Sequence, residues 1–440
     1  MKVKLLFFSV LVFSLSRLAT GQPVYNLNDC IATGLERNYS IRIARNNETI
    51  SDNNFSLGNA GFLPSLDLSS RYSGTVSNIT QDLTTGERNV SNGVNNSTGS
   101  ASVSLGWTIF NGFNVVTTYK KLNELKQLGE LNTQLSIENY VAGIISVYNA
   151  YIQQMQLVNN KQYAVTLSKE RLRIDEERYL LGSSSKLQVL QSKVYLNADS
   201  SSLSKQIETM RATQIQLNEL MAVDNLGSEF SITDTTINVI PDLLYEKLLE
   251  DTKTNNTNLL IAQSNKIVSE YDYKLAVSRI YPYLNFSTGY GYTLNKYSTG
   301  SYDQQVTGSF NYGLTLGMNL FDGFNARRNI RNSSIDIKNK ELKYSEVEQG
   351  VIADLITIYN AYRNNLRLIT LEEQNLETAT ENQSIAMERY KLGDLSGIDL
   401  REVQKSLLDA RESLLSIQYQ AKLAEISLKL ISGRVMEYYK

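Results

Sequence analysis

The chain has 440 residues, of which 42% are hydrophobic, carries a formal net charge of −2 at pH 7, and contains no histidine. A nearly neutral chain lacks the excess of positive charge with which proteins bind nucleic acid, so we expect no nucleic-acid partner. Without histidine, imidazole-based metal sites and the Ser-His and Cys-His types of catalysis are excluded. We expect no cofactor, no metal site and no enzymatic activity.

The first 21 residues have the layout of a secretory signal peptide. Lys2 and Lys4 give a positive start, the segment 5–15 is almost wholly apolar, and Ala19-Thr20-Gly21 offers small residues for cleavage. The apolar run is too short to span a bilayer as a helix, which argues against a membrane anchor. We expect an exported protein with residues 1–21 as its signal peptide.

The rest of the chain is predicted to be a tandem duplication. Pro64 recurs 218 residues later as Pro282, and Phe110-Asn111-Gly112 recurs 211 residues later as Phe321-Asp322-Gly323. Two offsets kept over so much of the chain indicate two copies of one structural unit. The predicted parts are a first repeat at 22–223, an inter-repeat linker at 224–241 and a second repeat at 242–440.

Each repeat is expected to contain a helix, two strands and two further helices in that order. The first helical stretch, of about 38 residues, ends at Pro64 or Pro282. After the strands, a helix of about 65 residues ends near Gly182 or Gly393, and a helix of about 40 residues returns.

The strands are predicted from a strict alternation of apolar and small polar residues. Alternation places one face of a sheet in an apolar medium and the other among polar groups. A half-buried sheet of a water-soluble domain would show the same pattern, but the signal peptide, a strand length near 10 residues and aromatic residues at strand ends favour a membrane β-barrel. The predicted strands lie near 65–77, 100–110, 283–296 and 306–321.

Four strands cannot close a barrel, and an open sheet edge is not tolerated in lipid, so several copies must combine their strands. Two copies would give eight strands and an interior filled by side chains, whereas three would give twelve strands and room for water. The predicted inner face consists of Ser, Thr, Gly and Asn, which favours the open lumen of a homotrimer.

The last helix carries an apolar seam with steps of three and four residues, which is typical of a coiled coil. Because the helices are joined to barrel strands, the simplest arrangement continues the barrel wall as a ring of helices. The predicted fold class is therefore mainly α with a membrane β-barrel. The seam consists of Leu400, Val403, Leu407, Ala410, Leu414, Ile417, Ala421, Ala424, Leu428 and Ile431.

At these motifs the chain resembles the TolC-like outer-membrane efflux protein family. The resemblance rests on the Leu63-Pro64 and Tyr281-Pro282 strand entries, the duplicated Phe-x-Gly strand exits, and the Glu-Arg-Tyr-x-x-Gly-x-x-Ser turns at 177–185 and 388–396. Relatives usually carry a second glycine where this chain has Phe113 and Phe324, so we expect a slightly different collar.

The resemblance implies a trimer with a twelve-stranded β-barrel and a twelve-helix periplasmic tunnel, in the outer membrane of a Gram-negative bacterium. It implies that the protein is the exit duct of a tripartite efflux or type I secretion system. The expected partners are outer-membrane lipid around the barrel, a periplasmic adaptor (membrane fusion) protein and an inner-membrane transporter. The alternative is a structural or adhesive outer-envelope protein. The sequence carries no mark of the exported substrate.

The resemblance also implies a periplasmic tip at the turns around Gly182 and Gly393. Asp399 and Glu402 match positions where relatives carry an acidic pore constriction, and a spacing of three places both carboxylates on one face of a helix. The alternative is surface pairing with Arg401 or Lys405.

The tip is expected to be unequal in the two repeats. The equivalents of the two acids in the first repeat are Gln188 and Gln191. Tyr390 matches a tip residue of the family that could hydrogen-bond across the tip, although packing in the helix seam is the alternative. Relatives carry a basic residue shortly after the second-repeat glycine, but Asp394 and Leu395 stand there, so that basic lock does not transfer.

Overall fold

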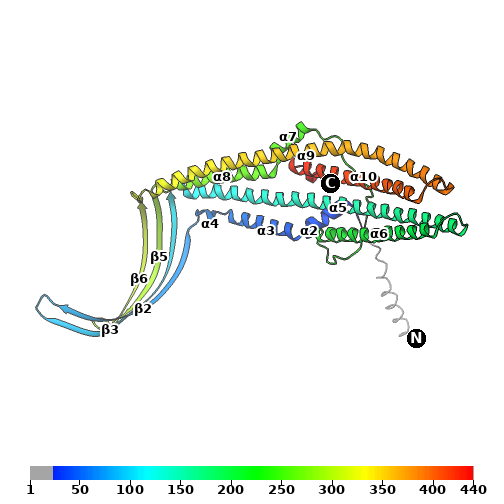
Figure 1. Cartoon of the computed structure of the whole chain (residues 1–440). Coiled ribbons are helices and arrows are strands. Elements are labelled where there is room, and N and C mark those ends of the chain that lie inside the picture. The colour runs from blue at the N-terminus through cyan, green and yellow to red at the C-terminus, as the bar shows by residue number, and fades with distance from the viewer. Residues whose placement is uncertain (1–22, 440) are drawn as a thin grey trace, which may run out of the picture. The chain divides into compact units, whose positions relative to one another are not determined.

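The structure is a computed structural model that describes residues 23–439, so the predicted signal peptide at 1–21 lies outside the described residues. The chain is mostly helical, with one four-stranded sheet (Figure 1). It divides into two compact units. One contains Leu131–Leu260, the segment from Glu346 onward and the chain up to Asn47; the other contains Glu48–Glu130 and Ile261–Ser345. No helix that the structure describes is long and apolar enough to cross a membrane.

The second unit contains the sheet, whose strands follow the spatial order β2-β3-β5-β6 and are all antiparallel. Residues opposite one another share a face, so Phe286 pairs with Leu314 and Tyr290 with Phe310 on the apolar face. That face is open: Leu314 is 66% exposed. The strands are β2 (Ser65–Asp82), β3 (Arg88–Asn111), β5 (Tyr283–Lys296) and β6 (Gln304–Gly317).

Three strands differ from the sequence-based bounds. The second strand was expected near 100–110, but β3 begins at Arg88 and β2 continues to Asp82, with a turn between them. This stretch is rich in Asn and Ser and lacks apolar alternation, so no period-two signal marks it although its backbone pairs. The fourth strand, expected to reach residue 321, ends at Gly317, because its partner β5 starts opposite it at Tyr283.

The first helical stretch of each repeat is also not continuous. In the first repeat it is split into α2 (Leu27–Arg37), α3 (Tyr39–Asn54) and α4 (Leu57–Ala60). In the second repeat it is split into α7 (Tyr245–Asn255) and α8 (Thr257–Ser278). Asn38 and Asn256 stand at the two breaks. Each side-chain oxygen accepts from a backbone N–H of the following helix, and each side-chain amide donates to a distant carbonyl group, of Leu220 or Ile431. Such local hydrogen bonds compete with a continuous helix.

The first unit contains the larger part of two helical hairpins, each made of one long helix and its returning partner (Figure 1). Their helices are α5 (Asn114–Leu180) with α6 (Lys186–Leu220), and α9 (Asn325–Leu392) with α10 (Gly397–Ile431). The largest apolar core gathers residues of α2, α5 and α6 around Ile144 and Tyr148. Around it lie the short parallel strands β1 (Val24–Tyr25) and β4 (Ser231–Ile232) and the 3-10 helix η1 (Val435–Tyr438).

Candidate functional site at the turns of the two helical hairpins

The turns of the two hairpins are built alike. Gly182 and Gly393 follow the long helices with φ angles of 75° and 89°, a left-handed conformation that glycine adopts without steric cost. Ser185 and Ser396 then cap the returning helices, because their hydroxyl groups accept hydrogen bonds from the backbone N–H groups of Gln188 and Asp399.

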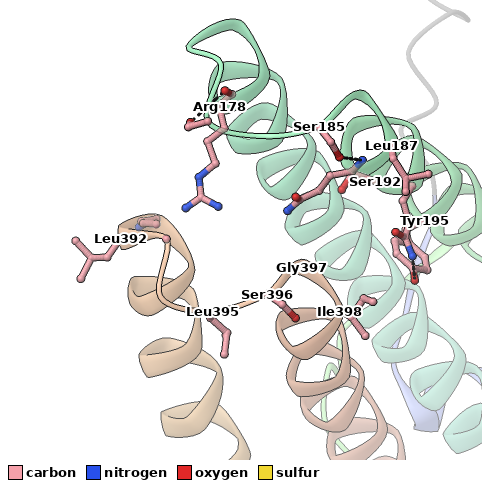
Figure 2. A pocket seen from close by; sticks show the side chains of 15 residues that line it. Arg178, Ser185, Leu187, Ser192, Tyr195, Leu392, Leu395, Ser396, Gly397 and Ile398 are labelled. Carbon is pink, nitrogen blue, oxygen red and sulfur yellow. Dashed lines mark hydrogen bonds between the residues drawn. The ribbon is translucent and has the colours of Figure 1, made fainter.

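A pocket of about 540 Å³ is lined by residues of both turns (Figure 2). The first hairpin contributes polar side chains, including Arg178, Gln188 and Gln191, and the second contributes Leu395 and Ile398. In Figure 2 the guanidinium group of Arg178 points from the first hairpin towards the second. Of the tip residues expected from the sequence, Gln188, Gln191 and Gly393 line this pocket.

Tyr390 joins the second hairpin to the first. Its side chain is fully buried, and its hydroxyl group donates a hydrogen bond to Oδ1 of Asp175 on α5. Gln188 Nε2 donates to the same oxygen at 3.2 Å and lies 3.4 Å from the tyrosine oxygen, while Ser192 donates to Oδ2. Burial and the neighbouring Asp175 carboxylate raise the pKa of Tyr390 to about 12, so the hydroxyl group remains protonated and a donor at neutral pH.

Arg178 contacts both the backbone and the ring of the same tyrosine. A guanidinium N–H donates to the carbonyl oxygen of Tyr390, and the guanidinium carbon lies 4.8 Å from the centroid of its ring. Arg389, the equivalent of Arg178 in the second repeat, instead binds Asp394 of its own turn at 2.9 Å. The guanidinium group that contacts Tyr390 therefore comes from the first repeat.

A second set of buried contacts lies further along the same helices. Arg401 on α10 binds both carboxylate oxygens of Asp199 on α6, at 2.7 and 2.8 Å. Arg171 on α5 donates to Gln404 on α10 at 3.1 Å. Both guanidinium groups lie over the ring of Tyr195: that of Arg171 is 4.8 Å from the ring centroid and that of Arg401 is 5.3 Å from it. Burial, and then the positive charge of Arg401, lowers the pKa of Arg171.

The two predicted acids remain at the surface. Asp399 and Glu402 are exposed, and neither forms a salt bridge with another residue that the structure describes. Ser396 donates to Oδ2 of Asp399 at 2.7 Å, so this carboxylate takes part in the helix cap. Arg401, a candidate surface partner of both acids, is bound to Asp199 instead. Gln191, the first-repeat equivalent of Glu402, donates to the hydroxyl group of Tyr195 at 3.1 Å.

Tyr390 was a candidate from the sequence, whereas the residues that surround it or extend its network, Asp175, Asp199, Arg171 and Arg178, were not. A signal exists in the repeat itself. Asp175 and Asp199 correspond to Ala386 and Ala410 at the offset of 211. A charged residue in one repeat that is alanine in the other, within a seam that is otherwise apolar, indicates a contact made by only one of the two hairpins.

Comparison with known proteins agrees with this fold. Residues 248–434 match the outer membrane efflux protein family. Outer membrane protein TolC of Salmonella enteritidis is 19% identical over 461 residues, covering 99% of this chain and 88% of its own length. The resemblance to the TolC-like outer-membrane efflux proteins is confirmed.

Solved structures show the same TolC-like fold. The Campylobacter jejuni CmeC outer membrane channel aligns with a TM-score of 0.77 at 15% identity, covering 93% of this chain and 86% of that one. The outer membrane protein VceC of Vibrio cholerae aligns with a TM-score of 0.74 at 16% identity, covering 92% and 96%. The relatives are outer membrane efflux proteins and channels, not enzymes, which supports a channel role in efflux and an outer-membrane location.

Proposed function

We propose that this TolC-like chain is the exit duct of a tripartite efflux or type I secretion system, which passively conducts substrates to the cell exterior. The observation that carries the proposal is the four-stranded sheet, which has an exposed apolar face and two unpaired edges at β2 and β6. An apolar face needs an apolar medium, and in lipid every backbone N–H and C=O group must find a partner. Both needs are met if copies pair β6 of one with β2 of the next.

The assembly is proposed to be a homotrimer with a twelve-stranded barrel. The opposite face of the sheet is polar, as where Ser69 and Ser102 hydrogen-bond across β2 and β3 at 2.9 Å. Eight strands would enclose only side chains, whereas twelve enclose water. The helical hairpins would continue the barrel wall as a tunnel, and residues 22–223, 224–241 and 242–440 would be the first repeat, the linker and the second repeat.

The hairpin turns are proposed to be the periplasmic tip, where the duct is closed at rest. The contacts of Tyr390 with Asp175 and Arg178 tie the two hairpins of one copy together, and opening requires that they separate. The exposed carboxylates of Asp399 and Glu402 would form an acidic ring at the constriction of the trimer.

The partner at the tip is proposed to be the helical hairpin of a periplasmic adaptor protein, which connects the duct to an inner-membrane transporter. Large apolar side chains stand exposed at both turns, where a partner with an apolar helix face would cover them. They are Leu180, Leu181, Leu187, Leu392 and Ile398, which are between 64% and 84% exposed.

The test of the channel function is ion conductance of the purified protein in a planar lipid bilayer. We expect discrete conductance steps from a detergent-extracted species with three times the mass of the mature chain. A stable monomer that needs no detergent, and that adds no conductance to the bilayer, would reject the proposal.

A further inference from the structure

Arg171 and Gln404 meet between the two helical hairpins and keep three N–H-bearing nitrogen atoms without a partner. Nη1 of Arg171, on α5, donates a hydrogen bond to Oε1 of Gln404, on α10, at 3.1 Å. Nε and Nη2 of Arg171 and Nε2 of Gln404 have no hydrogen-bond partner among the residues that the structure describes. Both side chains are fully buried. Because a buried donor without an acceptor costs free energy of folding, these donors favour a ligand.

The two unpartnered nitrogen atoms of Arg171 lie on one edge of its guanidinium group. Their N–H bonds are parallel in this planar group and form the fork with which arginine binds anions. The bond to Nη1 also fixes the amide orientation of Gln404, because exchanging its oxygen and nitrogen atoms would bring two donors together. Nε2 of Gln404 is therefore a third buried donor beside the guanidinium group.

The nearby carboxylates are bound to other groups. Both oxygen atoms of Asp199 accept hydrogen bonds from Arg401. Both oxygen atoms of Asp175 accept from uncharged donors, one of which is the hydroxyl group of Tyr390. Neither carboxylate forms a hydrogen bond with Arg171 among the contacts of the described residues.

The charges of this network do not cancel. It contains three guanidinium groups, of Arg171, Arg178 and Arg401, and two carboxylates, of Asp175 and Asp199, so one positive charge is in excess (3 − 2). Burial, and then the positive charge of Arg401, lowers the pKa of Arg171. An anion at the open edge of Arg171 would balance the excess and stabilise the charged guanidinium group.

The donors favour a small anion over the other possible ligands. All three nitrogen atoms are closed off from solvent, which disfavours a bulky anion such as phosphate or sulfate. A water molecule has two lone pairs for three donors and brings no negative charge. A monatomic halide accepts from all three donors and supplies the missing charge.

We propose that Arg171 and Gln404 bind a chloride ion between the two helical hairpins, and that this ion helps to hold the tip closed. Arg171 belongs to the first hairpin and Gln404 to the second, so an ion bound by both is released when the hairpins separate. The ring of Tyr195, over which Arg171 lies, also lines the 540 Å³ pocket at the turns, and this pocket is the path of entry. The effect of the ion on closure rests on the proposed function, whereas its binding does not.

Binding is tested with bromide, which replaces chloride and scatters X-rays anomalously. Crystals of the detergent-extracted wild-type protein would be grown with bromide as the halide. We expect an anomalous peak within hydrogen-bond distance of Nε and Nη2 of Arg171 in every copy of the chain. Bromide peaks at other positions only, or a water molecule at this position, would overturn the inference.

The variant Gln404→Glu supplies a built-in anion. Its carboxylate keeps an acceptor for Nη1 of Arg171 and brings the negative charge itself, so the bromide peak should disappear. In detergent at constant ionic strength, replacing gluconate by chloride should raise the midpoint of thermal unfolding of the wild type and leave that of Gln404→Glu unchanged. The matched control is Gln420→Glu, the same substitution at an exposed position of α10, which should behave like the wild type.

The effect on closure is measured in planar bilayers at constant ionic strength. Replacing chloride by gluconate should raise the open probability of the wild type and of Gln420→Glu about tenfold, because a ligand that binds only the closed tip shifts the equilibrium towards it. Gln404→Glu should keep the low value in both salts. A bromide peak with an open probability that does not depend on the anion would overturn the role in closure. Failure of the proposed function looks different: no protein would conduct, although bromide would still bind.

Discussion

The hydroxyl group of Tyr390, in the second helical hairpin, donates a hydrogen bond to the carboxylate of Asp175, in the first. Both side chains are fully buried within one chain. Their neighbours Gln188, Ser192 and Arg178 all belong to the first hairpin, so the second hairpin inserts one tyrosine into a polar cage built by the other. A buried network of this kind is stable only while every member keeps its partner.

Replacing Tyr390 by phenylalanine should weaken the attachment of the two hairpins. The ring is kept, but Asp175 loses a donor, which costs about 1–3 kcal/mol for a buried acceptor. We expect the free energy of unfolding in urea to fall by that amount. The matched control is Tyr179→Phe, at the equivalent position of the first repeat, where the side chain is 45% exposed and should contribute little. Equal losses in the two variants would contradict the assigned role.

Arg178 and Arg389 provide a second matched pair. Arg178→Met removes a contact between hairpins, whereas Arg389→Met removes one within a turn, to Asp394. We expect Arg178→Met to raise the open probability of the channel in a planar bilayer at least tenfold, and Arg389→Met to leave it near the wild-type value. The reverse order would show that the tip is held by the second repeat alone.

The raised pKa of Tyr390 predicts a pH window for this contact. Below pH 10 the hydroxyl group is protonated in both the folded and the unfolded chain, and its stabilising contribution is fully present. Between pH 10 and about 12 the unfolded chain loses the proton first, so this contribution declines as the pH rises. The stability difference between the wild type and Tyr390→Phe should therefore shrink across this window. A difference that stays constant from pH 8 to 12 would contradict the hydrogen bond.

The sequence predicts a strand or a helix end well only where the residue pattern that marks it is regular. The alternation of β5 and the duplicated Gly and Ser of the turns predicted strands and helix ends close to those observed. The first part of β3, from Arg88, was missed, because Asn and Ser side chains do not report which face of a strand they occupy. The partners of Tyr390 could not be predicted, since Asp175 is 215 residues away and only folding brings the hairpins together.

The exposed acids of the second repeat predict ion selectivity. If Asp399 and Glu402 line the constriction, a trimer concentrates about six carboxylates in a narrow ring, which attracts cations. We expect the closed wild-type channel to prefer cations, and the variant D399A/E402A to lose most of that preference. The measurement is the reversal potential under a salt gradient. Equal reversal potentials in the two proteins would place these acids on the outer surface.

Closure of the proposed channel at its tip by contacts between the two hairpins can be measured in a bilayer. The most direct test is the single-channel conductance of purified wild type and of R178M/Y390F in planar bilayers, with R389M/Y179F as the matched control. We expect small, brief steps for the wild type and the control, and large, lasting steps for R178M/Y390F. Wild-type steps as large and lasting as those of R178M/Y390F would contradict closure by these contacts, and the absence of steps in all three proteins would contradict the channel itself.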